Sequence, residues 1–215
     1  ETQRSGEKSE VSRLVPAREL PLTPEGIQGF RRRDRTRFEG DLTQVHVYRE
    51  WNTPHDGTED DNLLSLAATV LGQGKTSRLY QRLVYQDKLA DDVSVSQDSG
   101  ELASQFELEV DVKNGVDPAK VEAAVADVWK TFLEDGPTAD ELARAKTGFR
   151  AGYVRRLEQV GGFSGKATLL AAGQVYHDDP GAWRKDLAAM MEATPQQVRD
   201  ATRQWTSKGD YTLTV

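Results

Sequence analysis

The sequence predicts an α+β fold, a two-layer sandwich in which helices pack on one face of a mostly antiparallel or mixed sheet. Segments in which apolar and polar residues alternate occur near the start, in the middle and at the end of the chain. Longer segments with helical spacing lie between them. Hydrophobic residues make up 37% and charged residues 29% of the 215 residues, as in an ordinary globular domain.

The first expected strand covers residues 42–50, where valines alternate with polar residues. The spacing becomes helical over 58–71, and Thr58 stands at the position of an N-terminal cap. A shorter helix is expected next, through Leu79 and Leu83.

Two strands are expected after this helix, one centred on residues 93–95 and one over 104–112. In the second, apolar residues occupy one face, while Glu107, Glu109 and Asp111 occupy the other. Alternation along a half-buried strand explains these carboxylates without any catalytic role.

The second half is expected to be helical, because capping residues and prolines recur at helix starts and glycines separate the helices. The starts are Asp117–Pro118, Thr138–Glu141, Asp179–Pro180 and Thr194–Gln197. A further helix carries Leu169 and ends near Tyr176, and residues 211–215 form the closing strand.

Residues 1–25 contain three prolines and no periodicity, so we expect a linker or lead-in there and a single α+β domain over 26–215. Five arginines fall within residues 31–37. They indicate either an anionic partner or an edge strand whose charges discourage strand addition.

The net charge of −7 disfavours nucleic acid as a partner. No apolar run approaches the roughly 20 residues needed to cross a bilayer, so no membrane insertion is expected. The absence of cysteine excludes disulfides and thiolate metal ligands. It leaves the compartment open, because exported bacterial proteins also often lack cysteine.

Gly74, Lys75 and Thr76 match the end of a phosphate-binding loop. The first glycine of that motif should stand at Thr69, and the preceding residues have helical rather than strand spacing. Both departures exclude a nucleotide site.

The chain has three histidines, His46, His55 and His177, and contains no H-x-x-E-H or H-E-x-x-H motif. His46 and Glu50 lie four residues apart, a spacing that spreads ligands along a strand. We expect His46 to lie beside Tyr48 as a strand residue. The sequence thus predicts no catalytic and no metal-binding residue in this chain.

The stretch "LLSLAATVLGQGKTSRLYQRLVYQDKLADDVSVS" resembles a signature of the pitrilysin/insulinase family of zinc peptidases. Its family-marker residues are Gly72, Gly74, Ser77 and Arg78, in a turn between two helices. We expect both glycines to end the first helix and to supply positive φ angles. The segments "GPTADELARAKTGF" and "ATPQQVRDATRQW" also resemble this family, so the resemblance runs from about Thr36 to Val215.

The resemblance implies a non-catalytic, second-type domain that supports a zinc-bearing sister domain of the same parent chain. Some partner domains of this family carry an arginine and a tyrosine, seven residues apart, that reach the substrate; here these positions hold Val84 and Asp91. Because neither side chain can replace its counterpart, this substrate-contact pair is degenerate.

The implied function is to form part of a chamber that encloses an unfolded peptide substrate while the sister domain cleaves it. Zinc is then expected in the sister domain, with no cofactor in this chain, and the parent is expected to be a zinc metalloendopeptidase. The bacterial periplasm or secretion is the favoured location. The alternative is an inactive structural or binding subunit of the same fold, of the processing-peptidase or respiratory core type.

Overall fold

The computed structural model describes residues 44–215. Three expectations fall outside the described residues and remain predictions. They concern the linker over 1–25, the arginine-rich segment 31–37 and residues 42–43 of the first expected strand.

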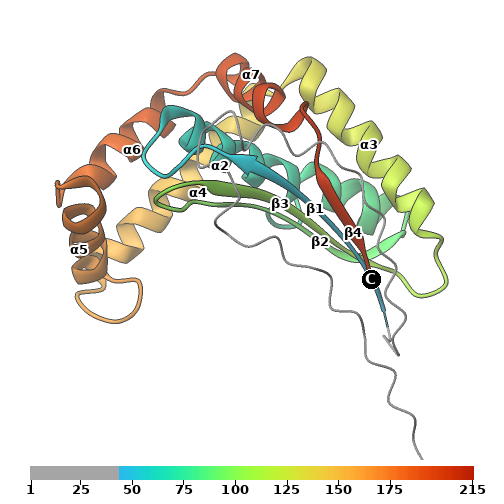
Figure 1. The fold of residues 1–215 in the computed structure, drawn as a ribbon, viewed down its shortest axis with the longest axis horizontal. Coiled ribbons are helices and arrows are strands. Elements are labelled where there is room, and N and C mark those ends of the chain that lie inside the picture. The colour runs from blue at the N-terminus through green and yellow to red at the C-terminus, as the bar shows by residue number, and fades with distance from the viewer. Residues whose placement is uncertain (1–43) are drawn as a thin grey trace, which may run out of the picture. The chain divides into compact units, whose positions relative to one another are not determined.

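Four antiparallel strands form the described sheet, in the order β2-β3-β1-β4 (Figure 1). They are β1 (Val45–Thr53), β2 (Ala90–Asp98), β3 (Ser104–Val112) and β4 (Tyr211–Thr214). The C-terminal strand β4 therefore pairs with β1, the first described strand of the chain.

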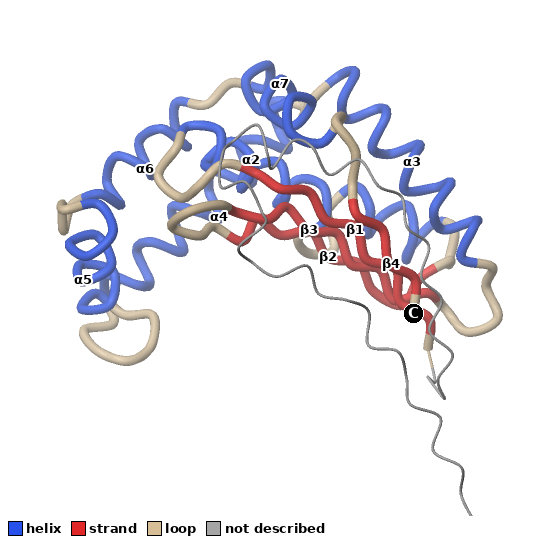
Figure 2. Tube along the Cα trace, in the orientation of Figure 1, coloured by secondary structure: helices blue, strands red, loops and turns tan. Residues whose placement is uncertain are grey.

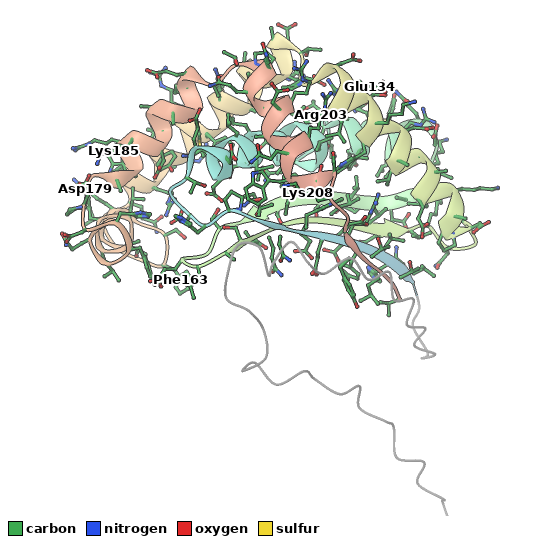
Figure 3. All side chains as sticks on the ribbon, turned by 45° about the horizontal axis from the view of Figure 1, so that its top comes forward. Glu134, Phe163, Asp179, Lys185, Arg203 and Lys208 are labelled. Atoms are coloured by element: carbon green, nitrogen blue, oxygen red, sulfur yellow. The ribbon has the colours of Figure 1, made fainter. Side chains whose placement is uncertain are left out.

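The helices form a layer over one face of this sheet, and α5 extends that layer beyond one end of the sheet (Figures 1 and 2). They are α2 (Glu59–Gly72), the π-helix η2 (Tyr80–Gln86), α3 (Pro118–Asp135), α4 (Ala139–Glu158), α5 (Lys166–His177), α6 (Ala182–Glu192) and α7 (Pro195–Thr206). Glu134 and Lys185 mark the solvent side of this layer (Figure 3). The α+β prediction with helices on one face is confirmed.

Side-chain caps fix the starts of four helices where the sequence predicts them. Thr58, Asp117, Thr138 and Thr194 each accept a hydrogen bond from a backbone N–H in the first turn. The last two form complete capping boxes. These predictions succeed because a cap depends only on residues within one turn.

The core lies between the sheet and the helices and is built around three aromatic rings. Trp51 on β1 stacks on Trp129 of α3 with ring centroids 4.7 Å apart. Phe106 of β3 meets both rings edge-on at 6.0 Å. The indole N–H of Trp129 donates to Thr206 of α7, which ties α3 to α7.

Three elements differ in detail from the expectation. β1 runs to Thr53, because Trp51 and Thr53 continue the buried alternation. α2 is buried on most sides rather than on one stripe, since it contacts β2 as well as α4, α6 and α7. The expected short helix is a π-helix, in which Asp87 N–H bonds to the carbonyl of Arg82.

Within residues 44–215, no helix is long and apolar enough to cross a membrane.

Candidate functional site

The family-marker turn connects α2 to η2, and its two glycines serve different purposes. Gly74 adopts φ +78°, as predicted, with open space around it. Gly72 does not need a positive φ, so that expectation is wrong for it. A Cβ on Gly72 would lie 2.4 Å from Cγ2 of Val95, which means that α2 passes too close to β2 for any side chain. Ser77, which is buried, donates to the carbonyl of Gly74 and closes the turn.

Arg78 holds the junction between α3 and α4. Its guanidinium donates to both carboxylate oxygens of Glu141, at 2.8 and 2.7 Å, and to the carbonyl of Gly136 at 2.9 Å. It also lies over the ring of Phe132, 5.2 Å from the centroid. Arg78 is thus engaged in structural contacts.

Burial alone would raise the pKa of Glu141, but hydrogen bonds from Arg78 and Thr138 outweigh it and hold the pKa at about 2. The carboxylate is therefore ionised at neutral pH and completes the cap of α4.

A hollow of about 420 Å³ adjoins this junction, between η2 and the α3–α4 connection. The two arginines that line it are already paired, Arg78 with Glu141 and Arg82 with Asp87. Their charges are therefore compensated within the chain, and the hollow is a poor candidate for an anion site.

Val84 and Asp91, the expected degenerate pair, lie in different surroundings. Val84 on η2 is partly buried and packs against the core. Asp91 is exposed at an irregularity in β2, where the pairing register shifts between Ala90 and Asp92, and it accepts a hydrogen bond from Gln44. The interpretation of this pair as lost substrate contacts stays a prediction.

The sheet face opposite the helices is the surface best placed to meet another molecule. Among the described residues, no helix covers it (Figure 1). Register places six carboxylates at outward positions: Glu50 on β1, Asp92 and Asp98 on β2, and Glu107, Glu109 and Asp111 on β3. We call this surface the open acidic face.

Neighbouring carboxylates on the open acidic face repel one another. Glu50 lies directly opposite Glu107 in the pairing of β1 with β3. Burial raises the pKa of Glu107, and the charges of Glu50, Asp98 and Glu109 raise it further. A hydrogen bond with Glu109, followed by burial and neighbouring carboxylates, raises the pKa of the Tyr48 phenol.

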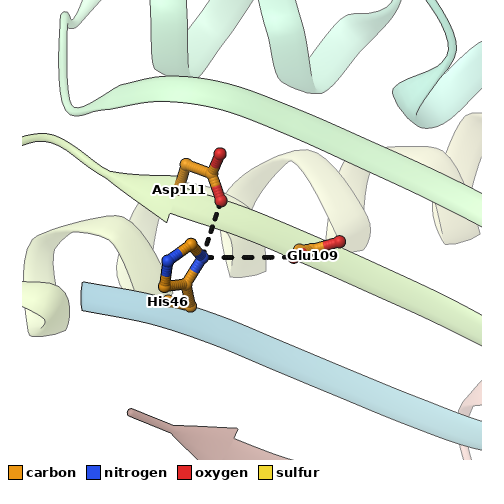
Figure 4. A group of neighbouring side chains, drawn as sticks. All are labelled: His46, Glu109 and Asp111. Carbon is orange, nitrogen blue, oxygen red and sulfur yellow. Dashed lines mark ion pairs between the residues drawn. The ribbon is translucent and has the colours of Figure 1, made fainter. Parts of the chain in front are cut away.

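His46 meets two carboxylates at one end of this face (Figure 4). Its Nδ1 lies 2.8 Å from Asp111 and 4.0 Å from Glu109, and the three ligand atoms lie within 4.8 Å of one another. The Nδ1 atom is shielded from solvent yet lacks a well-directed hydrogen bond. His46 also stacks on Tyr48, 6.1 Å between centroids, which confirms the expected neighbour.

This group was missed in the sequence because only His46 and Glu50, on one strand, suggested ligand spacing. Register brings Glu109 and Asp111 across from β3 instead. Carboxylates at alternate positions facing a histidine would have signalled the group, had the strand pairing been known.

Two polar residues that lie far apart in the sequence also come together. His177, the last residue of α5, places Nε2 3.1 Å from Asp56, which precedes α2. Nearby, the buried carboxylate of Asp61 accepts from Ser99 and Gln97, and burial raises its pKa. These contacts fix the start of α2 against α5 and the β2–β3 connection.

A model of the family described as the peptidase M16 inactive domain matches residues 6–149, well over half of the chain. The chain belongs to the peptidase M16 inactive-domain family. This finding confirms the resemblance to a non-catalytic domain of pitrilysin/insulinase-type zinc peptidases. Comparison with curated protein sequences gives no match.

Solved structures with the M16 domain fold superpose on most of the chain. A protease from Helicobacter pylori gives a TM-score of 0.73 at 16% identity, over 82% of this chain and 42% of that chain. The inactive peptidase domain of a candidate zinc protease from Bordetella parapertussis gives 0.68 at 18%, over 84% and 93%. A chain of complex III from Candida albicans gives 0.67 at 10%, over 82% and 44%.

Identities this low show the fold alone. This M16 domain spans less than half of the Helicobacter pylori chain. The family match also includes most of residues 1–25, whose assignment as a linker remains a prediction.

Proposed function

We propose that this inactive M16 domain pairs with a zinc-bearing sister domain of the same parent chain and helps to enclose an unfolded peptide for proteolysis. The observation that carries the proposal is the match to a domain family described as inactive. The absence of H-x-x-E-H from all 215 residues agrees with it. The catalytic zinc then belongs to the sister domain, and the bacterial periplasm or the cell exterior is the location we propose.

The open acidic face is the surface that we assign to the substrate side. Helices cover the opposite face (Figure 2). The apolar side chains that the sheet directs to that side are buried in the core. The open face instead presents polar, charged and aromatic side chains, including Tyr48 on β1 and the half-exposed Tyr211 on β4. Such a surface can bind an extended peptide through hydrogen bonds and ring contacts without a deep pocket.

The second candidate is an inactive structural or binding subunit of the same fold. The likeness to a chain of complex III from Candida albicans is the observation that favours it. The sequence of the parent gene separates the two candidates, because an H-x-x-E-H motif in a sister domain accompanies only the first.

The function is tested with a fluorogenic peptide and three samples: the parent protein, the parent without this domain, and residues 1–215 alone. We expect hydrolysis by the parent, loss of most activity without this domain, and no activity from the chain alone. Hydrolysis by the isolated chain that a chelator abolishes would refute the proposal, as would full activity after removal of the domain.

A further inference from the structure

The charges on the open acidic face have one sign. At the outward positions of the four described strands stand six carboxylates, no lysine and no arginine, with His46 as the only basic side chain. The chain as a whole contains 28 lysines and arginines against 35 acidic residues, so composition alone does not explain such segregation.

The arrangement opposes stability. Glu50 and Glu107 are direct cross-strand partners, and so are Asp92 and Asp111. Like charges in such positions repel and weaken the sheet. Replacing one member of each pair by a neutral or basic residue would remove the repulsion, yet both pairs are acidic in this chain.

Two further side chains on this face lack a full set of partners among the described residues. Nδ1 of His46 is shielded from solvent and lies close to Asp111, but without a well-directed hydrogen bond. Tyr211, beside Glu50 through the pairing of β4 with β1, is 50% exposed although it is a large aromatic side chain. An aromatic face next to carboxylates is a setting that suits lysine and arginine side chains.

We propose that the open acidic face binds positively charged, extended peptide segments, whose lysine and arginine side chains lie over the carboxylates and beside Tyr48 and Tyr211. The inference rests on the proposed function and names its substrate class. Outward side chains repeat every second residue along β3, the same repeat as in an extended peptide. Basic residues at alternate positions of a peptide lying along β3 can therefore meet Glu107, Glu109 and Asp111 in turn.

The test measures binding of fluorescent 12-residue peptides to residues 1–215 by anisotropy. One peptide alternates lysine with serine, and a matched peptide replaces each lysine by glutamine. We expect the lysine peptide to bind at least tenfold more tightly at low salt, and its affinity to fall as salt screens the charges.

Two double variants distinguish an effect of the open acidic face from an effect of the net charge of the chain. Glu107→Gln with Glu109→Gln removes two charges from the open acidic face. Glu134→Gln with Glu158→Gln removes two exposed charges from α3 and α4 in the helical layer. We expect the first pair to weaken binding of the lysine peptide at least tenfold and the second to change it less than twofold.

Three outcomes would overturn the inference. Equal weakening by both double variants would mean that only net charge matters. Equal binding of the lysine and glutamine peptides would remove charge selectivity while leaving the enclosing role intact. Zn²⁺ alone binding once per chain, lost in His46→Asn and competing with the peptide, would make a metal ion the cationic occupant. The enclosing role fails separately, if the parent keeps full activity without this domain.

Discussion

Arg78 on the segment after α2 and Glu141 on α4 form a two-pronged ion pair, with nitrogen–oxygen distances of 2.8 and 2.7 Å. Both side chains are more than four-fifths shielded from solvent, 18% and 17% exposed. Because Glu141 also completes the capping box of α4, one carboxylate joins the family-marker turn to the start of a long helix. A residue expected to mark the family from its sequence thus has a structural reason to be there.

Replacing Glu141 by glutamine should lower the free energy of unfolding at pH 7 by about 2 kcal/mol, a value that allows for partial solvent screening. The pKa of Glu141 in the folded chain is about 2, below the ordinary 4.5. Its stabilisation is therefore present above pH 4.5 and lost as the pH falls towards 2. Urea unfolding at pH 7 and pH 3 should show a smaller difference between wild type and variant at the lower pH.

The control is Glu134→Gln, whose exposed carboxylate lies 3.9 Å from Lys130. This variant should change stability by less than about 0.5 kcal/mol at either pH. A deficit for Glu141→Gln that stays constant with pH would show that the charge of Glu141 is not the source of the stability.

Alanine at position 72 should destabilise the chain by about 2 kcal/mol, because its Cβ would overlap Val95 and force α2 away from β2. The matched control is Gly148, exposed in α4, where a Cβ would meet no atom within 4 Å beyond its own helix backbone. There alanine should raise stability by roughly 0.5 to 1 kcal/mol through its helix propensity. Thermal or urea unfolding of the two variants checks both signs, and equal effects would contradict the close approach of α2 to β2.

Glu107→Gln should raise the stability of the isolated chain by about 0.5 kcal/mol at pH 7, because it removes the repulsion by Glu50. The pKa of Glu107 is raised above 4.5 in the folded chain. Its contribution therefore favours folding at low pH and is lost as the pH rises through that raised pKa. Unfolding curves from pH 4 to pH 8 should show the advantage of the variant growing with pH, and a loss of stability at pH 7 would count against repulsion on the open acidic face.

Local signals in the sequence predicted the helices and strands well. They could not predict which residues of distant strands lie opposite one another. Thr58, Asp117, Thr138 and Thr194 cap their helices because each needs only residues a few positions away. The π-helix was not predictable, because the spacing of Leu79 and Leu83 suits an α-helix equally well.

The composition of the open acidic face likewise could not be predicted from local sequence signals alone. Alternation correctly placed Glu107, Glu109 and Asp111 on the solvent side of β3. Which residues stand opposite them depends on the register between β1 and β3, set by turns and packing far along the chain. His46 beside Asp111 and Glu50 beside Glu107 are consequences of that register.

Photo-crosslinking to the parent protein tests most directly whether the open acidic face meets the substrate. The peptide substrate carries benzoylphenylalanine, and mass spectrometry maps the attached residues. We expect crosslinks in this domain to the outward positions of β1, β3 and β4, near Tyr48 and Tyr211. Crosslinks concentrated on α3 and α7, with none on the open acidic face, would contradict the claim that this face encloses the substrate.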